Sequence, residues 1–211
     1  MRARVPAARA GRGSSVAGLA CLTLWAVAAC GGRTAAPPEP GTVRGVAPDL
    51  RGRRVMVLPV QQVLGIAADP DAELAYGLGE RGVGVAWVFP AEIDEVLARS
   101  PAVQARTRGL PVGDFLMAEV NRVGDPLYGE LRRMAALVDA DAVFLPVQAA
   151  LAAEPGEDPR VRFWAALLEV RTGRVLWFSI LEGQAFPAGD PRGLASAVDE
   201  VTRSLLWYVS Q

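Results

Sequence analysis

Residues 141–183, DAVFLPVQAALAAEPGEDPRVRFWAALLEVRTGRVLWFSILEG, decide the fold of this chain. Three apolar runs fill the stretch, each as long as a buried strand. They span 141–151, 161–170 and 174–183, with a polar turn at 154–160 and a short connection at 171–173. Gly173 supplies the left-handed residue that so short a connection needs. The stretch therefore predicts three strands, of which the last two form an antiparallel hairpin.

Strands and helices alternate before this stretch, and one helix follows it. We predict strands at 54–60 and 83–89, and helices at 71–81, 91–100 and 125–140, with 61–70 as a loop. Asp125 suits an N-cap and Pro126 a first helical position, as Pro90 does for its helix. Residues 101–124 are ambiguous, with a short helix around 114–123. A closing helix at 192–209 has an apolar inner face of Leu194, Ala197, Val198, Val201, Leu205 and Tyr208.

This order of elements predicts the fold class. Helices between the early strands indicate parallel crossovers, whereas the later hairpin indicates antiparallel pairing. We expect an α/β (α+β) domain at residues 54–211, built on a single mixed β-sheet of about five strands with helices packed on it.

Composition limits the chemistry. All 22 basic residues are Arg, and the 211 residues include neither Lys nor His. Ser-His, Cys-His and Ser-Lys nucleophile pairs and Schiff-base lysines are therefore excluded. A hydrolase would need a carboxylate pair, and no pair of acidic residues is suitably placed. We expect no catalytic residue, cofactor or metal, and no enzymatic activity.

The amino terminus indicates export and lipid attachment. Residues 1–15 are rich in Arg without acid, and residues 16–29 form an apolar core too short to span a membrane. Val27-Ala28-Ala29-Cys30 resembles the lipobox of bacterial lipoproteins, which implies cleavage after residue 29 and a lipid on Cys30. The alternatives are an uncleaved anchor or a secretory signal with a chance cysteine. Gly31 and Gly32 in place of an acidic retention signal favour the outer membrane over the inner.

The expected mature chain differs in charge from the precursor. Residues 1–29 carry four Arg and no acid, which leaves 18 basic against 23 acidic residues, a net charge of −5. This balance argues against nucleic acid as a partner. We predict residues 30–53, rich in Gly and Pro, to be a flexible linker after the lipidated cysteine.

Three phrases carry a resemblance to a known family. They are RVMVLPV at 54–60, LVDADAVFLPV at 137–147 and LLEVRTGRVLW at 167–177. With the order of elements, they resemble the amino-terminal domain of TolB and the related lipoprotein domains of CsgG and LpoB. The resemblance implies a periplasmic, non-enzymatic domain that works by contact. The long hairpins with alternating lipid-facing residues that a CsgG-type pore requires are missing.

Two polar patterns have simpler explanations than a ligand site. Gly77–Gly82 matches G-x-G-x-x-G, but it follows a helix and precedes a strand, the reverse of the order that binds phosphate. We interpret it as a helix stop and tight turn. The acidic groups Glu92, Asp94, Glu95 and Glu154, Glu157, Asp158 are interpreted as solvated surface.

Trp164 and Trp177, with Phe178 beside the latter, are the candidate contact residues. The strands that contain these residues are apolar at odd and even positions alike. If both faces of the sheet are covered, all three side chains are core residues. The functional alternative is that one face or edge of this hairpin receives a partner. That hypothesis fails for Trp177 if its side chain is fully buried.

The sequence therefore predicts a lipid-anchored, periplasm-facing protein that acts as an adaptor or assembly factor of an envelope complex. Its expected partners are the membrane, through Cys30, and an envelope protein. A self-oligomerising secretion component of CsgG type is the alternative, in which the partner is a second copy of the chain.

Overall fold

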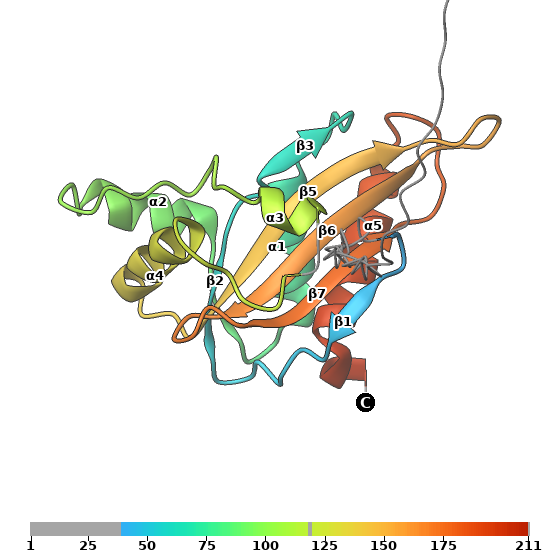
Figure 1. Cartoon of the computed structure of the whole chain (residues 1–211). Coiled ribbons are helices and arrows are strands. Elements are labelled where there is room, and N and C mark those ends of the chain that lie inside the picture. The colour runs from blue at the N-terminus through green and yellow to red at the C-terminus, as the bar shows by residue number, and fades with distance from the viewer. Residues whose placement is uncertain (1–38, 118–119, 211) are drawn as a thin grey trace, which may run out of the picture. The chain divides into compact units, whose positions relative to one another are not determined.

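The computed structural model describes residues 39–117 and 120–210 (Figure 1). Within them lies one mixed sheet of seven strands, in the order β1-β7-β6-β5-β2-β4, with β3 also paired to β5. The strands are β1 (Val43–Gly45), β2 (Arg54–Val57), β3 (Gln62–Leu64), β4 (Ala86–Val88), β5 (Ala142–Ala152), β6 (Arg160–Glu169) and β7 (Val175–Glu182). The helices are α1 (Pro70–Arg81), α2 (Pro90–Ala98), α3 (Gly113–Met117), α4 (Leu127–Leu137), α5 (Pro191–Leu205) and the 3-10 turn η1 (Trp207–Ser210). The predicted α/β class with one mixed sheet is confirmed.

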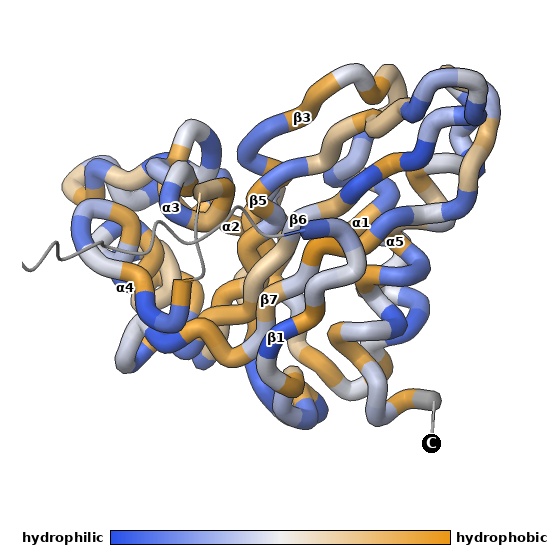
Figure 2. The backbone as a smooth tube through the Cα atoms, turned by 45° about the vertical axis from the view of Figure 1, so that its right-hand side comes forward, coloured by the Kyte–Doolittle hydropathy of each residue, from blue (hydrophilic) through white to orange (hydrophobic). Residues whose placement is uncertain are grey.

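The parallel half of the sheet is made of β4, β2 and β5. Val55 of β2 lies opposite Trp87 of β4 and Ala142 of β5. The chain moves outward from β2 to β4 through α1, and returns past β2 to β5 through α2, α3 and α4. Right-handed crossovers in opposite directions put their helices on opposite faces of a sheet. Accordingly α1 and α5 lie on one face and α2, α3 and α4 on the other (Figure 2).

The antiparallel half consists of β5, β6, β7 and β1. The β6–β7 turn uses Gly173 at a φ of 69°, and its N–H donates to the carbonyl of Glu169 at 2.9 Å. The predicted hairpin is therefore confirmed, including the left-handed glycine.

Two apolar cores flank the sheet, one on each face. Phe144, Phe163 and Trp177 pack under α1 and α5, whereas Leu145, Leu168 and Phe178 pack under α2, α3 and α4. The strands are apolar at odd and even positions because both faces are covered. The inner face predicted for the closing helix is buried as expected, although α5 itself ends at Leu205.

The linker prediction is wrong for residues 43–50. Val43–Gly45 form β1, which pairs antiparallel with Trp177–Ser179 of β7. Leu50 is fully buried, and the Trp207 indole N–H donates to the carbonyl of Ala47 at 2.7 Å. A three-residue strand flanked by glycine and proline has too little apolar periodicity to be recognised, because its partner is more than 130 residues away. The domain therefore begins before residue 54.

The expected count of about five strands is also too low. Besides β1, residues 62–64 of the predicted loop form β3, which pairs parallel with 148–150 of β5. β2 pairs with 142–144, so β2 and β3 follow the same edge of β5 in succession. β5 is long enough for two short partners, a property that local sequence does not show.

The start of α4 lies later than predicted. Its N-cap is Pro126, without a side-chain hydrogen bond, and the helix begins at Leu127. Asp125 still accepts a hydrogen bond from the N–H of Gly129 at 3.0 Å, so its carboxylate does stabilise the first turn. The short helix predicted around 114–123 is α3, which ends at Met117, and Val123 instead donates its N–H to the carbonyl of Gly173 at 2.9 Å.

Gly77 explains how α1 meets α5. The predicted helix stop is wrong for Gly77 and Gly79, which lie inside α1, and correct for Gly82, its C-cap. A Cβ placed at Gly77 would stand 2.8 Å from a methyl carbon of Val198 on α5, whereas one at Gly79 would meet nothing within 4 Å. The glycine pattern thus serves helix packing at its first position.

Candidate functional site

Trp177 lies in the core and not at a contact surface. Its side chain is 1% exposed, its ring lies 6.4 Å from that of Phe144, and its indole N–H donates to the hydroxyl of Ser204 at 3.3 Å. Phe178 is buried on the opposite face, 6.1 Å from Phe115. The hypothesis that Trp177 receives a partner is therefore wrong, because α5 covers this face.

Trp164 has a different environment. It is half-buried on the side of the sheet that carries α4, and it packs against that core from its border. Its indole Nε1 is enclosed and finds no hydrogen-bond acceptor in the described part of the chain. A buried N–H without an acceptor is costly, and structures usually pair it. Enclosed groups on Trp87, Ser179 and Tyr208 share this property among the described residues, so it does not by itself single out Trp164.

The surface around Trp164 is formed by two cross-strand rows, which together we name the open face. The residues within a row lie directly opposite one another, so they share one side of the sheet. One row is Gln62, Gln148 and Trp164, and the other is Leu64, Ala150, Arg162 and Glu182. Gln148 donates to Gln62 at 2.8 Å, and Arg162 donates to Glu182 at 2.8 Å. Within the open face, the side chain of Leu64 is 53% exposed.

This end of the sheet is covered unequally on its two sides. Phe163 and Val161, neighbours of Trp164 in β6, are buried on the side of α5. Ala150, Arg162 and Trp164 on the other side are only half-buried. In Figure 1, α2 and α4 lie toward the opposite end of the long strands, and α3 crosses in front of their middle. None of the described helices covers the open face, although α5 covers the other side of the same strands.

The outer edge of β7 is not free. β1 covers it at Trp177–Ser179, and the segment at 121–123 covers it at the β6–β7 turn. The N–H of Val175 donates to the carbonyl of Asn121 at 2.9 Å. The sequence-based idea that an edge of the hairpin receives a partner is therefore wrong for residues 174–180, which already have partners, and the face containing Trp164 is the candidate considered below.

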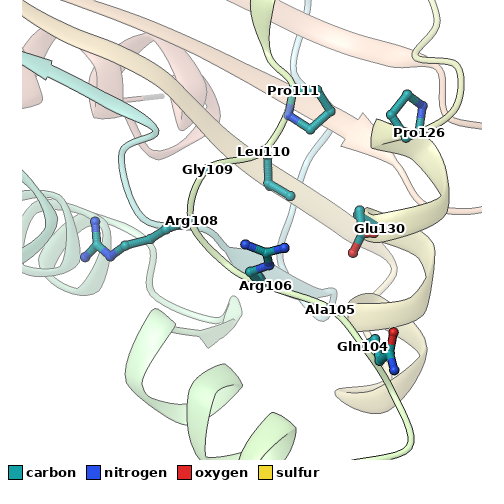
Figure 3. Close-up of a pocket in the computed structure, with 9 residues that line it drawn as sticks. All are labelled: Gln104, Ala105, Arg106, Arg108, Gly109, Leu110, Pro111, Pro126 and Glu130. Carbon is teal, nitrogen blue, oxygen red and sulfur yellow. The ribbon is translucent and has the colours of Figure 1, made fainter.

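A hollow of about 490 Å³ lies between the loop at 104–111 and the start of α4 (Figure 3). Gln61 fixes this loop, since its amide donates to the carbonyl of Thr107 at 2.9 Å and accepts from the N–H of Leu110 at 3.0 Å. Arg106 and Glu130 both line the hollow, whereas Arg108 points away from it in Figure 3 and pairs with Asp71. Glu130 pairs with Arg133. Glu130 is thus the one carboxylate among the described residues that line this hollow, and it has an arginine partner.

The acidic groups singled out in the sequence have structural partners or lie exposed. Glu92 pairs with Arg54 at 3.2 Å, and Asp94 accepts from the hydroxyl of Thr107 at 2.9 Å. Glu154, Glu157 and Asp158 lie exposed in the β5–β6 turn. Among the described residues, no three His, Cys, Asp or Glu side chains are grouped so as to hold a metal ion.

Cys30 and the apolar run before it lie outside the described residues, so the lipidation of Cys30 stays a prediction. Of the helices in residues 39–117 and 120–210, none is long and apolar enough to cross a membrane.

Sequence reasoning missed most of the open face. Only Trp164 was identified, because an aromatic residue in an apolar run attracts attention. Gln62, Leu64 and Gln148 were missed, since β3 was assigned to a loop and the rows exist only once β3, β5 and β6 are in register. The available signal was Gln148, a polar residue inside an otherwise apolar strand.

No protein-family model and no curated protein matches the chain. Among solved structures, the PelC dodecamer from Paraburkholderia phytofirmans is 14% identical, with a TM-score of 0.43, over 78% of this chain and 96% of that one. The LpoB C-terminal domain from Salmonella enterica is 17% identical, with a TM-score of 0.38, over 66% and 86%.

Lipoprotein GNA1162 from Neisseria meningitidis is 15% identical, with a TM-score of 0.37, over 75% of this chain and 97% of that one. Likenesses of this size establish no family and carry no weight for function. The resemblance to TolB, CsgG and LpoB drawn from the sequence stays a prediction.

Proposed function

We propose that this protein is a lipid-anchored adaptor of the bacterial cell envelope that works by contact and not by catalysis. Cys30 would carry the lipid and place the domain on the periplasmic side, at the outer membrane. The open face would receive an envelope protein. Trp164 carries this proposal, since its half-buried indole ring lies on a part of the sheet face that none of the described helices covers.

The chemistry of the open face suits protein recognition. Indole rings combine a large apolar surface with a donor and are enriched among residues that dominate binding energy. Leu64 and Ala150 add apolar area, while the two glutamines and the Arg162–Glu182 pair form a polar border.

The composition supports a non-catalytic role. The chain has no His and no Lys, and the carboxylate of Glu130, which lines the hollow beside α4, is paired with Arg133. A confirmed activity abolished by a single Asp or Glu substitution would contradict the proposal.

Site-specific photo-crosslinking in cells tests the contact. The crosslinking residue is placed at position 64 on the open face, and at position 76 on α1 as the control. Leu64 and Tyr76 are 53% and 66% exposed but lie on opposite sides of the sheet. We expect an adduct with one envelope protein from position 64, none from position 76, and loss of the adduct in Trp164→Ala.

Two other results would change the proposal. A ladder of self-crosslinks from position 64 would favour the oligomeric secretion component. Equal adducts from both positions would show that the open face is not selective. The anchor is tested separately by metabolic labelling with a fatty-acid analogue, which should label the chain and fail to label Cys30→Ala.

A further inference from the structure

Four arginines gather at the end of the sheet away from the open face. Arg53 precedes β2, Arg171 and Arg174 belong to the β6–β7 turn, and Arg122 lies opposite Arg174 in an antiparallel bridge. We name these four the arginine cluster. Glu169, at the end of β6, lies near three of them: its pKa is lowered by a hydrogen bond from the hydroxyl of Thr172 and, less strongly, by the charges of Arg174, Arg171 and Arg53.

The single carboxylate of Glu169 offsets only part of the charge of the four arginines. The carboxylate of Glu169 accepts a hydrogen bond from the hydroxyl of Thr172, which is the main reason for its lowered pKa. Within residues 39–117 and 120–210, none of the four guanidinium groups forms an ion pair or a side-chain hydrogen bond. Arg122 and Arg174 face each other directly, an arrangement of like charges that destabilises a pair of strands. An anion bound between them would remove this cost.

An exposed apolar side chain lies next to these charges. Arg53 and Arg174 line a hollow of about 340 Å³ together with the Glu169 carboxylate and the apolar residues Val46, Pro48, Val175 and Leu176. Val46 is 72% exposed. Guanidinium groups bind phosphate oxygens in a bidentate manner, and an apolar residue beside them can enter the region below lipid headgroups. This combination matches the surface of an anionic phospholipid membrane.

The length of the chain before the domain supports a membrane as the ligand. Eight residues, 31–38, separate Cys30 from the first described residue, and fully extended they span about 30 Å. From Glu39 the chain passes through β1 directly to Val46. A lipid on Cys30 would therefore keep the arginine cluster close to the membrane.

We propose that Arg53, Arg122, Arg171 and Arg174, with Val46, hold the domain against an anionic phospholipid surface. This inference rests on the proposed lipid anchor for its location. It adds a second attachment, which stable membrane binding commonly needs besides an acyl chain. Because the expected mature chain has a net charge of −5, overall charge does not favour such binding, and the cluster must act locally.

The test uses the unlipidated chain of residues 31–211, so its result does not depend on the anchor. Both cores draw all their members from residues 47–208, so this chain keeps everything that the fold buries. Sedimentation is measured with vesicles of phosphatidylcholine alone and with phosphatidylglycerol at three parts in ten. We expect binding to the anionic vesicles only, decreasing as salt rises.

Arg53→Gln with Arg174→Gln should weaken this binding about five-fold per arginine. The control is Arg99→Gln with Arg132→Gln, which removes the same charge from exposed positions beyond α2 and on α4 and should change binding little. The proposal is overturned if both double variants weaken vesicle binding equally, or if the unchanged chain does not bind anionic vesicles. Saturable binding of inorganic phosphate without vesicle binding also overturns it, in favour of a soluble ligand. Failure of fatty-acid labelling at Cys30 would instead refute the anchor and leave this measurement unaffected.

Discussion

Trp164 and Trp177 show at the residue scale how burial decides what an aromatic side chain can do. They lie on neighbouring strands but on opposite faces of the sheet. Trp177 fills the core beneath α5, with its N–H bonded to Ser204. Trp164 lies at the border of the other core with its N–H unpaired in the described structure.

Substitution to alanine should separate the two tryptophans. Trp177→Ala removes a fully buried side chain and should lower the free energy of unfolding by about 3–5 kcal/mol. Trp164→Ala should cost clearly less, because part of its ring already faces solvent, and should abolish the crosslink from position 64. Chemical denaturation followed by circular dichroism measures the first effect. Equal destabilisation by both changes would mean that Trp164 is a core residue only.

Glu169 reports on the arginine cluster. The hydroxyl of Thr172, followed by the charges of Arg174, Arg171 and Arg53, lowers its pKa. A carboxylate with a lowered pKa in the folded state contributes stability above its ordinary pKa, and this contribution is lost as pH falls through the lowered value. In Arg174→Gln we expect the pKa of Glu169 to rise. The stability that this carboxylate contributes should then be lost at a higher pH than in the unchanged chain. Carbon-13 NMR titration of the carboxyl group measures it, with Arg132→Gln as the unchanged control.

The elements are held together by close packing as well as by apolar area, and the contact of α1 with α5 is an example. Gly77 leaves room for Val198 and Thr202 on the facing helix. Asp69 caps α1 by accepting from the N–H groups of Asp71 and Ala72 at 2.9 and 3.3 Å. The cap fixes where α1 begins, and the glycine fixes how near it lies to α5.

Two glycine substitutions in α1 should therefore change the free energy of unfolding in opposite directions. Gly77→Ala puts a methyl group against the branched side chain of Val198, which should cost about 1–3 kcal/mol. Gly79→Ala adds a methyl group in open space and should stabilise the helix by about 0.5–1 kcal/mol. Thermal unfolding of the two variants gives the comparison. A stabilising Gly77→Ala would show that α5 moves away freely.

The whole domain depends on a segment that precedes the first recognisable strand. β1 closes the edge of β7, and Leu50 fills the core beside α5. The N–H of Ile180 donates to the carbonyl of Thr42 at 2.8 Å, so residues 39–50 satisfy backbone groups of the sheet.

A chain that begins at residue 54 should therefore be less stable than one that begins at residue 31. Burial of Leu50 alone contributes about 1.5–3 kcal/mol, and its removal also exposes apolar surface. We expect a lower denaturation midpoint and faster hydrogen exchange at the amide of Ile180, which loses its acceptor. Exchange at the amide of Leu58, which donates to Phe144 inside the sheet, is the internal reference. Unchanged protection at Ile180 would show that β1 is dispensable.

Much of the fold was readable from the sequence. The hairpin around Gly173, the closing helix with its buried face and the mixed sheet were predicted because each follows from local periodicity and turn residues. The strands β1 and β3 were not predicted, because three residues carry too little periodicity and their pairing partners are distant in the chain. Of the candidate site, the sequence identified Trp164 but not its neighbours.

By itself the sequence determined the class of the fold, which follows from the spacing of apolar and turn residues. It also determined the absence of histidine and lysine chemistry, which follows from composition alone. Only the tertiary structure decided which tryptophan is accessible, where the domain begins and which arginines gather around Glu169. These depend on which strands pair and in which register, and on which helix covers which face. Such contacts join residues far apart in the chain, so no local pattern contains them.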